Sequence, residues 1–165
     1  MEPYRIAEEL MVGVIGGVLS GFLVFVLLAR LKPRIEISEK IEHPVDSRYV
    51  IEIINRTKAP VVDLKAELQL VRSGSERQVA IERTQSIALL KHEIFELAKF
   101  DANDPRVDYA YRFVTNEDLG QRWHEGHILR FRVHAIHSWS NFGKTFTRDY
   151  HHKNSDIIAA DVSVR

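Results

Sequence analysis

A run of 20 consecutive residues without a charged side chain, residues 10–29, constrains this chain most. As an α-helix the run would be about 30 Å long, which matches the hydrocarbon core of a lipid bilayer. In a soluble fold, a helix that is apolar on all sides would have to be buried on all sides. The run therefore predicts a single transmembrane helix, which we assign to residues 10–31, and favours it over a buried core helix.

The flanking residues separate a retained anchor from a cleaved signal peptide. A signal peptide begins with a basic segment and ends at a small-residue cleavage site. Residues 1–9 are net acidic, and the run continues as Leu-Ala-Arg-Leu-Lys-Pro without an A-x-A-like site. The sequence therefore favours a retained anchor.

The cations beside the run predict its orientation. Arg30, Lys32 and Arg34 follow the run, whereas only Arg5 precedes it. Lys and Arg near the ends of a membrane helix stay on the cytoplasmic side. We therefore expect an extracytoplasmic N-terminal tail (residues 1–9), a basic juxtamembrane linker (residues 32–34) and a cytoplasmic domain (residues 35–165), carried by the inner (plasma) membrane.

The same three cations are candidate lipid-binding residues. Each Lys or Arg near an anionic leaflet contributes about 1 kcal/mol of attraction. Arg30, Lys32 and Arg34 could therefore recruit anionic headgroups. The alternative is that they only determine the topology of the helix.

Small residues recur on the predicted helix. Gly13, Gly17 and Gly21 are spaced by four and form two overlapping GxxxG motifs. Such spacing makes a shallow groove along which two helix backbones can approach closely. We expect association through this face, with a second copy or with another membrane protein. The alternative is the general abundance of glycine in membrane helices.

After residue 34 the hydrophobic period changes to two. Apolar residues at positions 62, 64, 66, 68 and 70 alternate with polar ones, which is typical of a half-buried strand. Similar patterns occupy residues 49–53, 109–113 and 129–135, and shorter candidates are residues 35–38, 78–82, 87–90, 94–97, 144–150 and 160–164. Seven to nine short strands separated by turn signals predict an all-β fold, an immunoglobulin-like β-sandwich. Thr115 with Asp118 predicts the N-cap of one helical turn.

The chain contains no cysteine, which excludes disulfides, thiolate nucleophiles and Cys-based zinc sites. His124 and His127 are one residue short of the H-E-x-x-H spacing, so their rings would not share one helical face. His134 and His137 would point to opposite faces of one strand. We therefore predict no metal site and no cofactor.

Other polar groups have simple structural interpretations. Asp101, Asn103, Asp104 and Asp108 lack the glycine and the bidentate Glu of a calcium loop, and are better explained as turn formers around Pro105. Asn55-Arg56-Thr57 fits the glycosylation acceptor pattern but is explained as a turn between strands. Arg130, Arg132 and His134 form a basic stripe that we interpret as a solvated strand face.

The sequence offers no recognisable catalytic machinery. It contains no P-loop, nucleophile elbow or dinucleotide fingerprint. Residues 35–165 carry 19 basic and 20 acidic residues, so no overall basic charge favours nucleic acid. We predict a non-enzymatic module that has no nucleic-acid partner.

The order of these features resembles one known family. An apolar helix ends in Ala-Arg-Leu-Lys-Pro-Arg and is followed by Ile-Glu-Ile-Ser. A long alternating strand covers residues 61–71, and Tyr-Arg-Phe-Val-Thr at 111–115 leads into Asn-Glu-Asp-Leu. The last feature is a strand at 129–137 with a hairpin through Gly143. This succession resembles the end of the inner helix and the cytoplasmic immunoglobulin-like domain of inward-rectifier potassium channels. The resemblance implies a cytoplasmic sandwich, assembly of several copies, and lipid contact through Arg30, Lys32 and Arg34. The chain has no pore helix and no T-V-G-Y-G-like filter, so ion conduction is not implied.

The chain is also similar to small bacterial single-pass membrane proteins of unassigned function. We therefore expect a membrane-anchored binding or scaffold module that self-associates through its glycine face and contacts anionic lipid or a membrane protein. The alternatives are an extracytoplasmic binding domain on a signal anchor and an enzyme with an unrecognised site.

Overall fold

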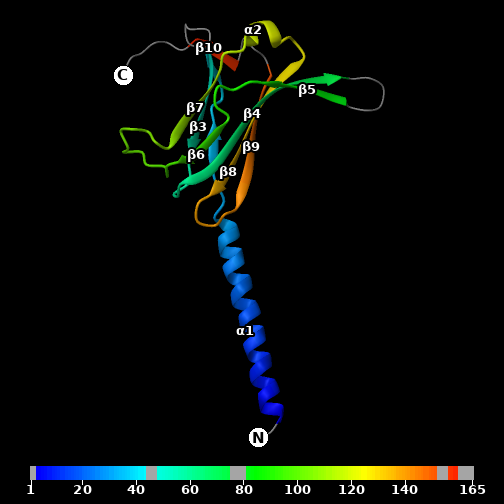
Figure 1. Cartoon of the computed structure of the whole chain (residues 1–165), viewed down its shortest axis with the longest axis vertical. Helices are drawn as coiled ribbons and strands as arrows, with labels where there is room; N and C mark the ends of the chain where they lie inside the picture. Colours follow the sequence, from blue (N-terminus) through cyan, green and yellow to red (C-terminus); the bar gives the residue numbers. More distant parts are fainter. Residues whose placement is uncertain (1–2, 44–47, 75–80, 152–155, 160–165) are drawn as a thin grey trace.

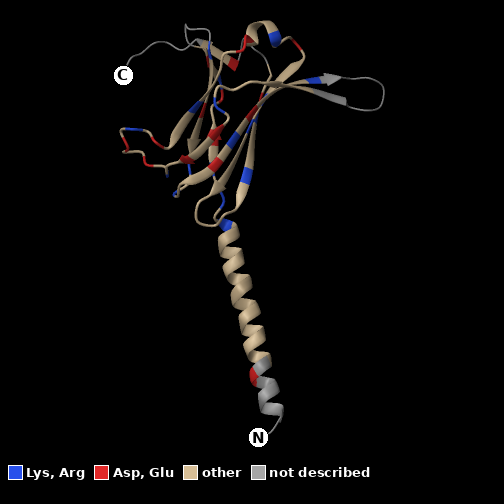
Figure 2. Ribbon diagram, in the orientation of Figure 1, with Lys and Arg blue, Asp and Glu red and all other residues tan. Residues whose placement is uncertain are grey.

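A long helix and a β-rich domain make up the computed structural model, which describes residues 3–43, 48–74, 81–151 and 156–159 (Figure 1). Helix α1 (Pro3–Arg30) projects away from the strands. Its segment Met11–Arg30 is apolar enough to cross a membrane, and none of it is buried against the domain. The segment is uncharged up to the cation at its end, as Figure 2 shows.

Helix α1 extends beyond the predicted membrane segment at its N-terminal side and ends one residue earlier than predicted. The amide of Leu31 still donates to the carbonyl of Leu28, at 2.9 Å. Pro33 restricts the residue before it to extended conformations, which explains why the helix cannot continue through Lys32.

The strands form two sheets. In the first, β3 (Tyr49–Asn55) pairs with β7 (Ala110–Thr115) on one edge and with β1 (Ile35–Ile37) and β2 (Ile41–His43) on the other, and β10 (Ile157–Ala159) adds to β2. In the second, β4 (Val61–Gly74) pairs with β5 (Ile81–Ile87) and β6 (Glu93–Leu97) on one edge and with β8 (His127–His137) on the other, and β9 (Gly143–Tyr150) follows β8. All described pairs are antiparallel except β2 with β10.

The core lies between the two sheets. Residues on β8 alternate between buried and partly exposed, as the period of two predicted, and Leu129, Phe131 and Val133 are fully buried. The ring of Phe131 meets that of Phe113 on β7, with the ring centroids 5.5 Å apart. Burial of such a side chain contributes about 1.5–3 kcal/mol, so each of these rings adds to the stability of the packing between the sheets.

Hydroxyl groups connect the sheets at two places. Tyr150 on β9 is fully buried and donates to the carbonyl of Ser38, at 2.9 Å. Burial raises the pKa of Tyr150 to about 12, so the hydroxyl keeps its proton and remains a donor. Thr115 at the end of β7 donates to the carbonyl of Ala88, at 2.7 Å.

The predicted helical turn exists, but its cap was assigned to the wrong residue. Helix α2 (Leu119–Arg122) is capped by Asp118, whose carboxylate accepts from the amide of Gln121 at 3.1 Å. Thr115 is still paired with Tyr49 in the sheet, so it cannot begin a helix. The extended backbone therefore moves the cap three residues further along the chain.

Several strand predictions also need correction. Residues 88–90 do not form a strand but connect β5 to β6, with the amide of Leu90 bonded to the carbonyl of Val114. The short strands β2 and β10 were not predicted. The predicted strand at residues 160–164 and positions 78–80 of another lie outside the described residues.

Candidate functional site

The glycine face of α1 is open. A side-chain carbon built at Gly13, Gly17 or Gly21 would have nothing within 4 Å. On the same helix the hydroxyl of Ser20 donates to the carbonyl of Gly16, at 2.6 Å. This hydroxyl is therefore satisfied within its own helix and costs little in an apolar environment. The three glycines remain a predicted association face.

The basic linker lies where α1 meets the domain. Arg30, Lys32 and Arg34 are all exposed, and none of them forms an ion pair with another described residue. The linker backbone is nevertheless held in place. The amide of Arg34 donates to the hydroxyl of Thr57 at 2.8 Å, and its carbonyl accepts from the amide of Arg56 at 2.8 Å. The backbone of Arg34 is therefore fixed to the domain, and the three exposed side chains are accessible to a ligand.

The loop between β8 and β9, residues 138–142, lies against the end of the helix (Figure 1). The hydroxyl of Ser140 donates to the carbonyl of Leu31. The ring of Phe142 meets the ring of Phe25 edge-on, with centroids 6.0 Å apart. The base of the domain is thus attached to α1 through both the linker and this loop, which sequence reasoning did not identify.

His137, at the end of β8, stabilises the β8–β9 loop through hydrogen bonds. Its side chain is buried, and its Nδ1 accepts from the amides of Trp139 and Ser140 at 3.2 and 3.3 Å. These bonds require Nδ1 to be unprotonated. Burial lowers the pKa of His137, which favours this neutral form. Trp139, by contrast, is 71% exposed.

The other histidines and the acidic loop form no cluster of metal ligands. Across the described part of the chain, no group of three or more His, Asp or Glu side chains could hold an ion. The carboxylates of Asp101 and Asp104 accept from backbone amides within their own loop, at 3.0 Å. His134 is partly exposed on the opposite face of β8 from the buried His137. The two carboxylates therefore stabilise the turns of their own loop.

Asn55 is buried and structural. Its side-chain amide donates to the carbonyls of Ala59 and Ala98, at 3.1 and 2.7 Å, and its oxygen accepts from the amide of Thr57. All its hydrogen-bonding groups are thus used inside the fold. The acceptor pattern at this position therefore marks a turn, as the sequence indicated.

The basic stripe on β8 is partly neutralised. Arg130 binds the carboxylate of Asp149 on β9 through two hydrogen bonds, at 2.8 and 2.9 Å. The hydrogen bond from Arg130 is the main cause that lowers the pKa of Asp149. This pair joins neighbouring strands and leaves less positive charge for a ligand.

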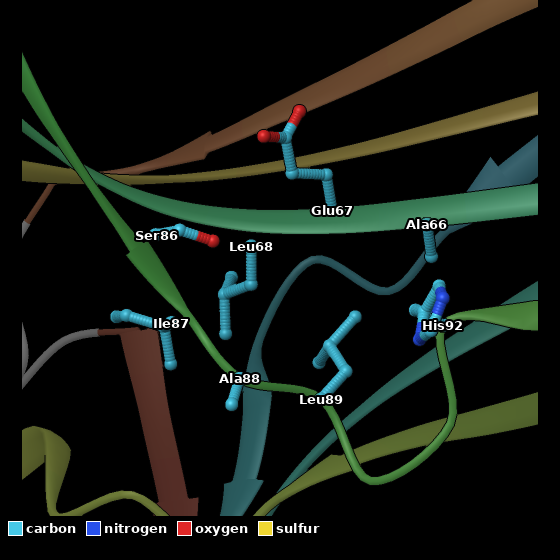
Figure 3. A pocket seen from close by; sticks show the side chains of 8 residues that line it. All are labelled: Ala66, Glu67, Leu68, Ser86, Ile87, Ala88, Leu89 and His92. Atoms are coloured by element: carbon cyan, nitrogen blue, oxygen red, sulfur yellow. The ribbon is translucent and has the colours of Figure 1, made fainter.

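A pocket of about 310 Å³ lies where β5 leaves β4 (Figure 3). Its lining includes the aliphatic side chains of Leu68, Ile87 and Leu89, together with His92. Glu67 also lines the pocket but points to the opposite side of β4 from His92 (Figure 3). The two titratable groups therefore cannot act together as an acid–base pair.

No protein-family model matches the sequence, and comparison with curated proteins gives no significant match.

Proposed function

We propose that this chain is a single-pass membrane protein that holds a non-enzymatic β-sandwich at the membrane surface as a binding or scaffold module. The main support for the proposal is the exposed apolar surface of α1. Among the described residues 17 large apolar side chains are exposed, and 11 of them lie on α1. Leaving that surface in water would cost about 1.5–3 kcal/mol for each side chain. A bilayer removes this cost and matches the length of the segment.

The sandwich is proposed to be of the immunoglobulin type. In the lettering used for such domains, β1 and β2 take position A, β3 takes B and β7 takes E, so that the first sheet reads A-B-E. In the second sheet β5 and β6 take C′, β4 takes C, β8 takes F and β9 takes G. This order, C′-C-F-G, supports the proposed immunoglobulin type. The parallel strand β10 is an addition at one edge.

The domain is proposed to face the cytoplasm and to contact anionic lipid. The positive-inside rule supports this side, because three cations follow the span and one precedes it. The exposure of Arg30, Lys32 and Arg34 supports the lipid contact. Association through Gly13, Gly17 and Gly21 would bring several domains together at one place on the membrane.

Membrane anchoring is tested by placing charges in the span of the full chain. The Leu19→Lys/Leu23→Lys double variant should cost about 3–4 kcal/mol per substitution on insertion. We expect the unmodified chain to float with lipid vesicles in a density gradient and the double variant to be lost from that fraction. Phe95→Lys is the matched control, because Phe95 is 86% exposed but lies on β6. If the unmodified chain instead stayed at the bottom of the gradient, separate from the floating vesicles, the proposal would be contradicted.

Lipid binding is tested separately on the detergent-solubilised chain. Replacing Arg30, Lys32 and Arg34 by Gln should weaken binding of phosphatidylglycerol by up to about 3 kcal/mol, at about 1 kcal/mol for each cation. The control is Lys40→Gln/Arg72→Gln, which removes exposed cations away from the linker. Equal effects of the two variants on affinity would show that the linker is no specific lipid site.

A further inference from the structure

The loop between β8 and β9 lies beside the end of the apolar helix segment. Phe142 meets Phe25, and Phe25 lies five residues before Arg30 within the segment Met11–Arg30. At 1.5 Å per residue this contact lies about 7.5 Å inside the end of the helix. When α1 occupies a bilayer, the loop therefore reaches the boundary between the headgroups and the acyl chains.

The loop presents a side chain suited to that boundary. Trp139 is 71% exposed, although a large aromatic ring in water is unfavourable. Tryptophan is enriched at membrane interfaces, because its ring prefers an apolar environment while its N–H needs a polar partner. The exposed cations Arg30 and Lys32 lie beside the same end of α1 and would attract lipid phosphates.

The loop is also rigid enough to hold this side chain in place. The amide of His137 donates to the carbonyl of Phe142, and the amide of Asn141 donates to the carbonyl of His137, both at 3.0 Å. The Nδ1 of His137 accepts from the amides of Trp139 and Ser140. Asn141 has a positive φ of 58°, a conformation that Asn tolerates in tight turns. The ring of Trp139 is thus presented by a preformed turn.

We propose that the β8–β9 loop is a second membrane contact, which inserts Trp139 into the interfacial region of the phospholipid bilayer next to the end of α1. This inference rests on the proposed membrane anchoring. It adds that the domain is held at a fixed orientation on the bilayer, by the helix at one point and by the loop at another. The lipid interface is the proposed partner of the loop, because Phe142 joins the loop to the apolar surface of α1 through its contact with Phe25.

The inference is tested by quenching of tryptophan fluorescence in the full chain. The protein is reconstituted into phosphatidylcholine–phosphatidylglycerol vesicles in which the acyl chains carry bromine close to the headgroup. The chain has two tryptophans, and Trp123 is buried in the core. The emission that is lost in the Trp139→Phe variant therefore measures the contribution of Trp139. We expect the brominated lipid to quench most of this contribution.

A matched control moves the exposed tryptophan to the opposite end of the domain. Gln121→Trp in the Trp139→Phe background places the tryptophan on α2, at the end of the domain opposite to α1 (Figure 1). Its emission should be unaffected by the brominated lipid. An unquenched Trp139 in protein that floats with the vesicles would overturn the loop contact while leaving the anchor intact. That result would also be the outcome if Trp139 served a protein partner. Failure of the chain to float would overturn the anchor and the loop contact together.

Discussion

His137 provides a quantitative test of how the membrane-facing loop is held. Replacement by Phe keeps a planar ring in a buried position but removes the Nδ1 acceptor of the Trp139 and Ser140 amides. A net contribution of about 0.5–1.5 kcal/mol is typical of one such hydrogen bond. Both distances are long, so we take the lower half of that range and expect His137→Phe to cost about 1–2 kcal/mol in total.

The assay is urea unfolding of the full chain in detergent micelles, followed by tryptophan fluorescence. His134→Phe is the control, because His134 lies on the same strand but on the opposite, partly exposed face. Its effect should stay within about 0.5 kcal/mol, as expected for a surface substitution. Equal free-energy losses in the two variants would refute the assigned role of His137.

The pH dependence of stability tests the same assignment. Burial lowers the pKa of His137 below its ordinary value of 6.5, so the unfolded chain takes up this proton before the folded chain does. The contribution of the neutral ring is complete above about pH 6.5 and is lost as the pH falls towards the folded-state pKa. The free energy of unfolding should therefore fall more steeply below pH 6.5 in the unmodified chain than in His137→Phe. Parallel curves would contradict this.

The remaining predictions concern the helix, the sheet and the core. Gly17→Ile should weaken self-association in a membrane two-hybrid assay, whereas an unchanged signal would remove the glycine face as a contact. Asp149→Asn should cost up to about 1 kcal/mol of stability in urea unfolding at neutral pH. Because Arg130 lowers the pKa of Asp149, this difference from the unmodified chain should disappear as the pH falls through the acidic range. Phe131→Ala should cost about 3–5 kcal/mol, and a loss below 1 kcal/mol would contradict its place in the core.

The sequence predicted the features that depend on neighbouring residues. The alternation along β8 determines which side chains can face the core, so the burial of Leu129, Phe131 and Val133 follows from the pattern alone. The apolar run predicted α1 for the same reason, since its length and composition are local properties.

Features that depend on distant contacts could not be predicted in this way. The bond from Ser140 to Leu31 joins residues 109 positions apart, and no local pattern encodes it. The cap at Asp118 depends on the pairing of Thr115 with Tyr49 in another part of the chain. One signal for the membrane-facing loop was present. A tryptophan within a turn, in a chain that also carries an apolar helix, is a candidate for the membrane interface.

Single-cysteine labelling tests whether α1 spans the bilayer. The sequence contains no cysteine, so an introduced thiol is the only one that can react. Glu9→Cys places a thiol near the start of α1, and Gln121→Cys places one on α2 in the domain. A membrane-impermeant maleimide added to intact cells should label the Glu9→Cys variant and should label the Gln121→Cys variant only after the membrane is permeabilised. Labelling of both variants from the same side of an intact membrane would contradict a helix that spans the bilayer.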